Sequence, residues 1–219
     1  MRVLLAGLIA LLPVSVWAAG GGGHGEHMMQ APVNMQDKVS LQNGARLFVN
    51  HCMGCHSLKY LRYGRMAEDL EIPEGLADKH LNFSGKKIGA SMTNAMNPGE
   101  AEDWFGVAPP DLTLETRRRS ADWVYSYLLG FYEDESATYG YNNHIFENVA
   151  MPHVMADMEQ QVGEEQFREA MGDITNFLAY AGEPHRMDRE RIGVYVLAFL
   201  FILLIPAWFL YKEYWKDVD

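Results

Sequence analysis

The chain has few cysteines, no surplus of positive charge and no internal repeat. Two cysteines among 219 residues exclude a fold stapled by several disulfides. The 29 acidic residues outnumber the 18 lysines and arginines and leave a formal net charge of −11. A protein that binds nucleic acid presents a basic surface, so this charge argues against such a partner. No segment recurs at a fixed period, and we therefore expect one ordinary domain.

What the chain does have is the pentapeptide Cys52-Met53-Gly54-Cys55-His56, which holds both cysteines. Cys-x-x-Cys-His is the attachment motif of a c-type haem. Two thiols at this spacing bond to one porphyrin, and the histidine that follows becomes the proximal iron ligand. A thioredoxin-type redox pair needs a surrounding βαβ pattern, and a zinc site needs further ligands nearby. We therefore expect Cys52 and Cys55 to bind haem c and His56 to ligate its iron.

The N-terminus is typical of a secretory signal peptide. Arg2 supplies one positive charge, an apolar stretch follows over residues 3–16, and Val16-Trp17-Ala18 offers small residues at a cleavage site. We predict a signal peptide over residues 1–18 and a flexible segment over residues 19–38. The alternative is a retained membrane anchor. It is disfavoured because the apolar stretch is short for a span and runs straight into glycines.

The C-terminal end holds another long apolar run. No charged residue occurs between Ile192 and Tyr211, a length that lets one helix cross a bilayer. Interfacial aromatic residues lie at its end, namely Trp208, Tyr211, Tyr214 and Trp215. Basic residues flank both ends and do not orient the helix, but a cleaved signal exports everything up to Arg191. We therefore expect a single-pass transmembrane helix over residues 192–211 and a cytoplasmic tail over residues 212–219.

Residues 39–185 remain for the exported domain, which we expect to be mostly α-helical. Ser40 is placed to cap a first helix that leads directly to Cys52. One face of that helix holds Leu41, Gly44, Ala45 and Phe48. Because Gly44 has no side chain, a second helix can cross closely there.

Two further helices are expected in this domain. The stretch from Glu164 to Ala181 has apolar residues at helical spacing and is closed by Gly182 and Pro184. Another helix is expected over residues 121–132. Contact between the first helix and residues 164–181 beside a haem would give a domain like a class I c-type cytochrome. The segments between them are rich in Gly, Pro, Asn and Asp and predict long ordered loops that wrap the cofactor.

The sixth iron ligand decides between an electron carrier and a haem that binds other ligands. Met151 stands out among thirteen methionines, because it lies far downstream of His56 and Pro152 can hold its thioether in place. His153 is an alternative that would lower the potential, whereas methionine raises it. An open position, as in a peroxidase or gas sensor, is a third option. Competing methionines are Met66, Met92, Met96, Met155, Met158 and Met171.

The order of these motifs resembles the cytochrome c1 family, the haem-bearing subunits of bacterial cytochrome bc1 complexes. The resemblance covers residues 39–216. It rests on Ser40-Leu41-x-x-Gly44, on the haem pentapeptide followed by Ser57, on Pro109-Pro110-Asp111-Leu112 before an arginine cluster, on Met151-Pro152, and on Phe177-Leu178-x-x-Ala181-x-Glu183-Pro184 before the terminal span. The haem motif is specific by itself. The other motifs are not specific individually, but their order together with the terminal span is.

The resemblance implies that His56 and Met151 ligate the iron and that Arg117 pairs with a haem propionate. A buried carboxylate needs charge-assisted donors, which a guanidinium supplies in pairs. Arg119 is the alternative, since alternation turns Arg118 away from both, and a solvated basic turn is another.

Aromatic residues just after this arginine cluster are candidates to line the haem pocket. They are Trp123 and Tyr125. Plain core packing is the equal alternative for both.

The resemblance also implies an electron-transfer subunit of quinol:cytochrome c oxidoreductase that makes no bond itself. Electrons would arrive from a Rieske iron-sulfur protein and leave to a periplasmic c-type cytochrome. The implied setting is a dimeric complex with cytochrome b and lipid in the bacterial inner (cell) membrane, with the haem domain in the periplasm. Acidic residues at 68–74 and 133–135 would steer a basic partner or serve solubility. The alternatives are a membrane-anchored haem enzyme or sensor with an open sixth position, and a free-standing tethered electron shuttle.

Overall fold

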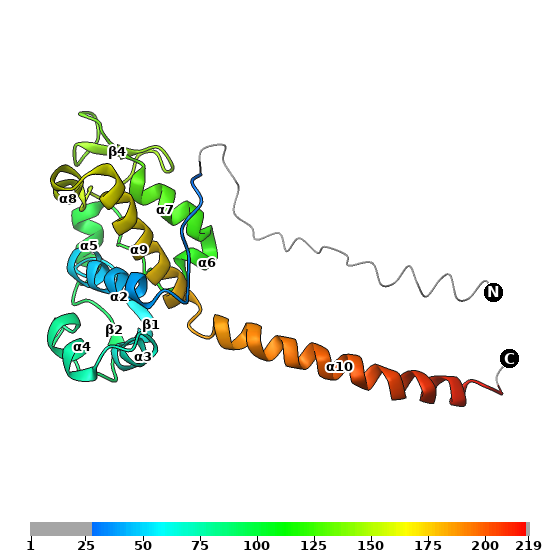
Figure 1. The fold of residues 1–219 in the computed structure, drawn as a ribbon. Coiled ribbons are helices and arrows are strands. Elements are labelled where there is room, and N and C mark those ends of the chain that lie inside the picture. Colours follow the sequence, from blue (N-terminus) through cyan, green and yellow to red (C-terminus); the bar gives the residue numbers. More distant parts are fainter. Residues whose placement is uncertain (1–27, 218–219) are drawn as a thin grey trace.

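The structure is a computed structural model that describes residues 28–217. Figure 1 shows a helical domain from which one long helix, α10 (Arg186–Tyr214), extends to one side. The mostly helical class expected from the sequence is confirmed. The predicted signal peptide (1–18) and residues 19–27 of the segment predicted to be flexible lie outside the described residues.

The domain combines helices with two small antiparallel sheets, β1 with β2 and β3 with β4. In chain order the elements are α2 (Lys38–Leu47), the π-helical turn η1 (Phe48–Cys52), β1 (Leu58–Arg62), α3 (Tyr63–Asp69), α4 (Glu74–Leu81), β2 (Ser91–Met92), α5 (Pro98–Phe105), α6 (Glu115–Arg119), α7 (Ala121–Leu129), β3 (Phe131–Glu133), β4 (Tyr141–Asn143), α8 (Ala156–Gln161) and α9 (Glu164–Gly182). The sheets are short, so helices supply most of the core.

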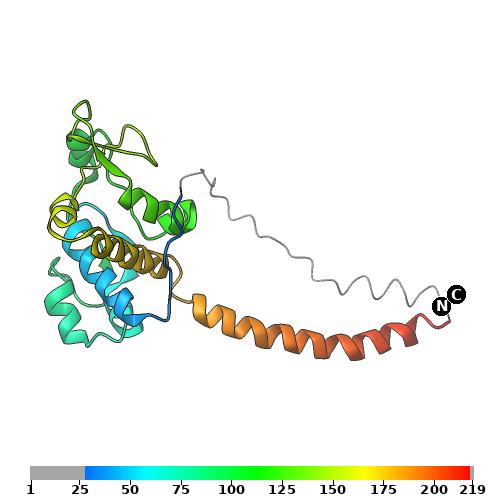
Figure 2. The ribbon, with the colours of Figure 1, turned by 45° about the horizontal axis from the view of Figure 1, so that its top comes forward.

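Helices α2 and α9 cross at close range, and both views of the ribbon show them side by side (Figure 2). A Cβ atom on Gly44 would overlap the backbone carbonyl oxygen of Asp173 and lie 2.8 Å from Cβ of Phe177. The absence of a side chain at Gly44 therefore permits the crossing. This confirms the close helix contact predicted at that residue.

Helix α2 begins at Lys38 and is capped by Asp37, whose Oδ1 accepts a hydrogen bond from the amide of Ser40 at 3.0 Å. The prediction that Ser40 is the cap is wrong, because the helix begins two residues earlier and Ser40 is its third residue, whose amide bonds to the capping carboxylate. The Ser40 hydroxyl instead accepts a hydrogen bond from Nδ2 of Asn176 at 3.0 Å. Ser40 thus ties α2 to α9.

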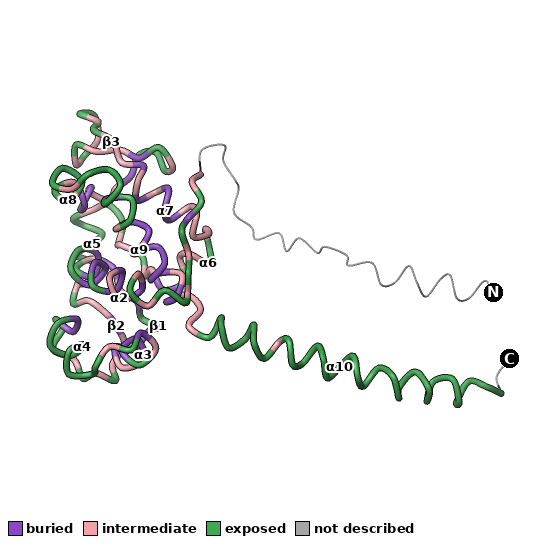
Figure 3. Tube along the Cα trace, viewed as in Figure 1, coloured by how far each residue is buried: buried purple, intermediate pink, exposed green. Residues whose placement is uncertain are grey.

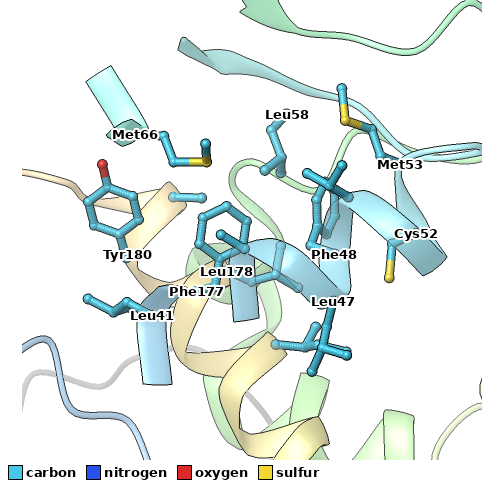
Figure 4. Packing of buried hydrophobic residues seen from close by; sticks show 14 of the residues in the cluster. Leu41, Leu47, Phe48, Cys52, Met53, Leu58, Met66, Phe177, Leu178 and Tyr180 are labelled. Atoms are coloured by element: carbon cyan, nitrogen blue, oxygen red, sulfur yellow. The ribbon is translucent and has the colours of Figure 1, made fainter. Parts of the chain in front are cut away.

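The apolar core surrounds this crossing (Figure 4). The rings of Phe48 and Phe177 lie 5.8 Å apart between centroids, and neither residue is exposed to solvent. Tyr180 extends the aromatic cluster with a centroid 6.1 Å from that of Phe177. Cys52 lies at the edge of the same cluster. The segment that leads into the cysteines therefore packs against the buried aromatic core of the domain.

The helix predicted over residues 121–132 is shorter. Helix α7 ends at Leu129, and the chain then enters β3, which pairs with β4. Nδ2 of Asn143 donates a hydrogen bond to the carbonyl oxygen of Tyr127 at 2.8 Å, and the amide of His144 donates to the carbonyl oxygen of Gly130 at 2.9 Å. A partner 16 residues away thus satisfies a carbonyl in the last turn and ends the helix. The helix predicted over residues 164–181 is confirmed as α9.

The described part of the N-terminal segment is bonded to the domain. The amide of Met29 donates to the hydroxyl of Ser126 at 2.7 Å, and the amide of Ala31 donates to Asp122 Oδ1 at 2.8 Å. Farther along, the amide of Asn34 donates to Oδ1 of Asn176 at 3.0 Å. Residues 28–37 therefore lie across α7 and α9, and the folded domain begins before the predicted boundary at residue 39.

Helix α10 stands apart from the core. It contains the predicted run 192–211, and none of its residues is buried (Figure 3). Its 29 residues span about 44 Å at 1.5 Å per residue, more than the roughly 30 Å hydrocarbon thickness of a bilayer. Within residues 28–217 it is the one helix long and apolar enough to cross a membrane. The residues of α10 that precede the apolar run include several charged side chains, which suit the membrane surface.

Candidate functional site

The approach to the cysteines is a π-helical turn. After α2 the chain widens into η1, and the amide of Met53 donates a hydrogen bond to the carbonyl oxygen of Phe48 at 2.9 Å. The amide of His56 then donates to the carbonyl oxygen of Cys52 at 2.8 Å. Single π-helical turns inside helices commonly occur at functional sites, because the extra residue redirects the side chains that follow. Here the turn presents Cys52 and His56.

The two cysteines are not joined by a disulfide; Cys52 is buried and Cys55 half-buried. Burial, reinforced by the neighbouring Cys55, raises the pKa of the Cys52 thiol to about 12. A redox-active cysteine pair needs a thiol whose pKa is lowered instead. The environment therefore disfavours dithiol chemistry and suits permanent thioether bonds, in which neither sulfur ionises.

His56 is held by a single well-formed hydrogen bond. Its Nδ1 lies 2.8 Å from the backbone carbonyl oxygen of Pro110, and the residue is 8% exposed. Burial lowers the pKa of His56, although that hydrogen bond and the charges of Glu115 and Asp111 oppose the shift. A carbonyl partner requires Nδ1 to carry the proton, which leaves the Nε2 lone pair free for a metal. The motif around Pro110 therefore orients the imidazole.

A cavity of about 490 Å³ lies beside these residues. Its volume falls within the roughly 300–1,000 Å³ typical of ligand and cofactor sites. The cavity brings together Cys52, Cys55, His56 and Met151, four of the five predicted site residues. Most other lining side chains are apolar and come from α7, α9 and the loops around residues 105–112 and 146–154.

Met151 enters the cavity from the loop that follows β4. Its Sδ accepts a hydrogen bond from the hydroxyl of Tyr127 on α7, with an oxygen–sulfur distance of 3.5 Å. Among the methionines of residues 28–217, Met151 alone lines this cavity. Four competitors are buried elsewhere in the core, namely Met66, Met92, Met155 and Met171. Met96 lines a separate cavity of about 180 Å³.

His153, the alternative sixth ligand, is occupied outside the cavity. Its ring stacks on Phe131 with centroids 4.7 Å apart and packs edge-on against Tyr141. Its Nε2 lies 2.7 Å from Oε2 of Glu159. The residue is 8% exposed and is absent from the cavity lining. Its contacts make it a support for the loop that carries Met151.

The arginine cluster divides between two environments. Arg117, predicted to pair with a propionate, does not line the cavity; its Nη1 lies 2.6 Å from Oε2 of Glu183 and its side chain is 55% exposed. Arg118 and Arg119 both line the cavity, and both lie near Glu115. The prediction from the sequence assumed that neighbouring arginines point to opposite sides, which would turn Arg118 away from Arg117 and Arg119. That assumption does not apply, because α6 is a helix in which successive residues lie about 100° apart.

Arg119 has a buried donor without an acceptor. Its Nε lies 3.1 Å from Oε1 of Glu115 but makes no hydrogen bond to any residue that the structure describes. Its guanidinium lies over the ring of Trp123 at 4.3 Å and within 5.5 Å of the Phe146 ring. One glutamate and two arginines leave a charge of +1 on this wall. An anionic group in the cavity would complete the hydrogen bonding of Arg119.

Two features of the site were not predicted from the sequence. The carbonyl of Pro110 belongs to the backbone, so its role has no signature in residue types. Tyr127 lies four residues after Trp123, on the same face of α7, and helical spacing alone connects the two. The prediction for the aromatic pair was half correct, because Trp123 lines the cavity and Tyr125 does not.

The residues present fit a covalently bound haem. Two cysteine thiols, one buried and one half-buried, an imidazole with one nitrogen left free, a mostly apolar cavity and an unsatisfied arginine donor meet the requirements of thioether attachment, ligation and propionate binding. A zinc site needs about four ligands. Within residues 28–217 no group of three or more His, Cys, Asp or Glu side chains lies close enough to hold a metal ion.

Comparisons with known proteins agree with this geometry. Residues 27–218 match the model of the Cytochrome C1 family. The chain is 44% identical over 244 residues to cytochrome c1 of Allochromatium vinosum, a match that covers 99% of both chains. It is 39% identical over 235 residues to a protein of Nitrosomonas europaea named ammonia monooxygenase gamma subunit, covering all of both chains.

A more distant relative is mitochondrial. Cytochrome c1 1 of Arabidopsis thaliana is 25% identical over 265 residues, covering 99% of this chain and 81% of that protein. Members of the matched family are membrane-anchored electron-transport proteins with one covalent haem c. On the family match and the full-length identity, the chain belongs to the cytochrome c1 family.

Proposed function

We propose that this chain carries electrons in a bc1 complex, from a Rieske iron-sulfur protein to a periplasmic c-type cytochrome. Cys52 and Cys55 hold the haem, and His56 and Met151 ligate its iron. The observation that carries the proposal is that one apolar cavity gathers all four residues, although 99 positions separate Cys52 from Met151. When bound, the haem supplies a one-electron Fe(III)/Fe(II) couple.

The residues of the cavity adjust that couple. The carbonyl of Pro110, 2.8 Å from Nδ1 of His56, keeps the imidazole in the tautomer that ligates through Nε2. A thioether from Met151 favours the reduced state more than a second imidazole would, which raises the potential. The mostly apolar walls limit the water around the iron and further disfavour the more highly charged ferric form.

The arginines complete the site. Arg119 binds a propionate through its Nε donor, which makes no hydrogen bond within residues 28–217, and its positive charge balances that carboxylate. We infer this role for Arg119 in preference to Arg117, because Arg117 lies outside the cavity and pairs with Glu183. The charge balance keeps a buried anion from lowering the potential.

The position of α10 supports the membrane topology. The folded domain ends at α9 and the anchor begins at Arg186, so only a short connection separates the haem domain from the bilayer. We infer that the domain lies on the periplasmic side, as the N-terminal signal sequence predicts, and that α10 packs against a cytochrome b subunit in a dimeric complex. Since α10 buries none of its apolar surface within this chain, lipid and neighbouring helices are left to cover it.

Replacement of Met151 by Leu tests the ligand assignment. Leucine keeps the volume and apolarity but removes the sulfur. We expect the potential to fall by about 100 mV or more, equivalent to about 2.3 kcal/mol for one electron. The weak long-wavelength band of Met-ligated ferric haem should vanish, and electron flow from quinol should fail. Redox titration and absorbance spectra measure these changes.

Met155→Leu is the matched control, because Met155 is only 2% exposed but lies outside the cavity. Its potential and spectrum should stay as in the wild type. Loss of the band in a different methionine variant, with Met151→Leu unchanged, contradicts the assignment.

The alternative functions have their own tests. An open sixth position is excluded if the wild-type ferric protein is low-spin. Purification in mild detergent without a haem b subunit would favour the tethered shuttle.

A further inference from the structure

One contact in the cavity neither attaches the haem nor ligates its iron. The hydroxyl of Tyr127 donates a hydrogen bond to Sδ of Met151 across 3.5 Å, and both residues line the cavity. A thioether sulfur has two lone pairs, of which one can bond a metal. A hydroxyl on the other lone pair therefore fixes which side of the sulfur is free.

The Tyr127 ring is held from two sides. It stacks on Trp123, with centroids 5.1 Å apart and 11° between the planes. Phe131 meets it edge-on at 5.3 Å and 71°. The guanidinium of Arg119 lies 4.3 Å from the centre of the Trp123 ring. A row of contacting side chains thus runs through Arg119, Trp123, Tyr127 and Phe131. The direction of the hydroxyl is thus set by packing and does not depend on Met151.

The loop that carries Met151 is held by the same row. Phe131 stacks on His153, with centroids 4.7 Å apart and 6° between planes. The amide of Val154 donates to the carbonyl oxygen of Pro152 at 2.9 Å, and Nε2 of His153 lies 2.7 Å from Glu159. The donor and the sulfur are therefore held by contacts that share Phe131 and that meet again at the hydrogen bond from Tyr127 to Met151.

We propose that Tyr127 is a positioning residue for Met151, whose hydroxyl orients the thioether and withdraws electron density from its sulfur. A sulfur that donates less electron density stabilises ferric iron less, so the contact favours the reduced state. The inference deepens the proposed function and rests on it, because it requires Met151 to be the sixth ligand.

Replacement of Tyr127 by Phe in the full-length, haem-loaded protein tests the role. The substitution keeps the stacked ring and removes only the hydroxyl. We expect the reduction equilibrium to shift toward the oxidised protein by between about threefold and tenfold, where tenfold corresponds to 59 mV for one electron. Imidazole added to the ferric protein should displace the methionine several times faster, since the sulfur is less well oriented.

Tyr125→Phe is the matched control. Tyr125 is a buried tyrosine on the same helix whose hydroxyl donates to the carbonyl oxygen of Arg168 at 3.4 Å, outside the cavity. Its variant should keep the wild-type potential and displacement rate. Thermal unfolding is followed for both variants. If Tyr127→Phe lowers only the unfolding temperature and leaves the potential unchanged, the role is structural and the proposal is overturned.

A double-mutant comparison separates this inference from the ligand assignment. If Tyr127 acts through Met151, Tyr127→Phe should produce no further shift in a Met151→Leu background. A shift of the same size in both backgrounds overturns the positioning role and leaves the ligation intact. If Met151→Leu itself leaves the potential unchanged, the ligand assignment and the inference fail together.

Discussion

Gly44 of α2 lies against the backbone carbonyl of Asp173 in α9, with no room between the helices for a Cβ atom. This crossing supports η1, which leads into Cys52 and the haem cavity. Helix packing and the placement of the first cysteine are therefore connected through one residue without a side chain.

Gly44→Ala should destabilise the fold. The alanine methyl would collide with the carbonyl of Asp173, and overpacking of this kind costs about 1–3 kcal/mol. Gly75→Ala in α4 is the matched control, because no heavy atom lies within 4 Å of its added Cβ. That variant should be neutral or gain up to about 1 kcal/mol from helix propensity. Thermal unfolding measures both, and equal stability of the two variants would show that the crossing can relax.

Covalent attachment and iron ligation should separate by mutation. Replacing Cys52 and Cys55 together should abolish covalent haem, whereas His56→Ala should keep covalent haem and lose the low-spin spectrum. Haem staining on a denaturing gel and absorbance spectra distinguish the two. Stained haem in the double cysteine variant would disprove attachment at these residues.

Removal of α10 should release the domain from the membrane. A chain truncated after Arg191 lacks the helix segment that is long and apolar enough to span, while every buried core residue precedes it. We expect a soluble exported protein with an unchanged haem spectrum. The measurement is fractionation of washed membranes. Retention of the truncated protein there would point to a second anchor, such as an uncleaved signal.

The two arginine environments predict different redox effects. Arg119→Gln should lower the potential by about 40 mV, equivalent to about 1 kcal/mol, because a propionate loses its charged partner and then favours ferric iron. Arg117→Gln should leave the potential unchanged, since Arg117 contacts Glu183 outside the cavity. Redox titration of both variants decides between them. The reverse order of effects would restore Arg117 as the propionate partner.

The ion pairs of Glu183 with Arg117 and Arg189 should stabilise the fold in a pH-dependent way. Partial burial acts to raise its pKa, but the hydrogen bond from Arg189 and the charge of Arg117 outweigh burial and hold the pKa below the ordinary value. A lowered folded pKa stabilises the fold above the ordinary pKa of glutamate, and this stabilisation is lost as the pH falls through the lower value. Its size at neutral pH is about 0.2–1 kcal/mol, as for other exposed ion pairs.

The test is Glu183→Gln, which should lower the unfolding temperature at pH 7 and have progressively less effect as the pH falls below the ordinary pKa of glutamate. Glu190→Gln is the control, because Glu190 pairs with Arg186 within α10, where both side chains are exposed. Its effect should be smaller. A Glu183→Gln deficit that persists at acid pH would mean that packing, and not charge, is lost.

Local patterns were sufficient to predict the haem motif, the anchor and one long helix. The attachment motif consists of three positions within one pentapeptide, Cys52, Cys55 and His56, because thioether spacing is a local covalent requirement. The span over 192–211 depends only on the length of an apolar run, and α9 depends on a strong 3.6-residue period. No distant contact is needed for any of these, so the sequence alone determined them.

Properties that depend on distant partners required the tertiary structure. Asn143 satisfies the carbonyl of Tyr127, and α7 ends where its propensity would have continued the helix. The choice between Arg117 and Arg119 depends on which of them faces the cavity, and residue type is identical at both positions. Likewise, the sequence holds thirteen methionines of identical residue type, and the tertiary structure decided that Met151 lines the cavity. Sequence determined which chemical groups are present, whereas the three-dimensional packing decided which of them share one cavity, because that depends on contacts between residues far apart in the chain.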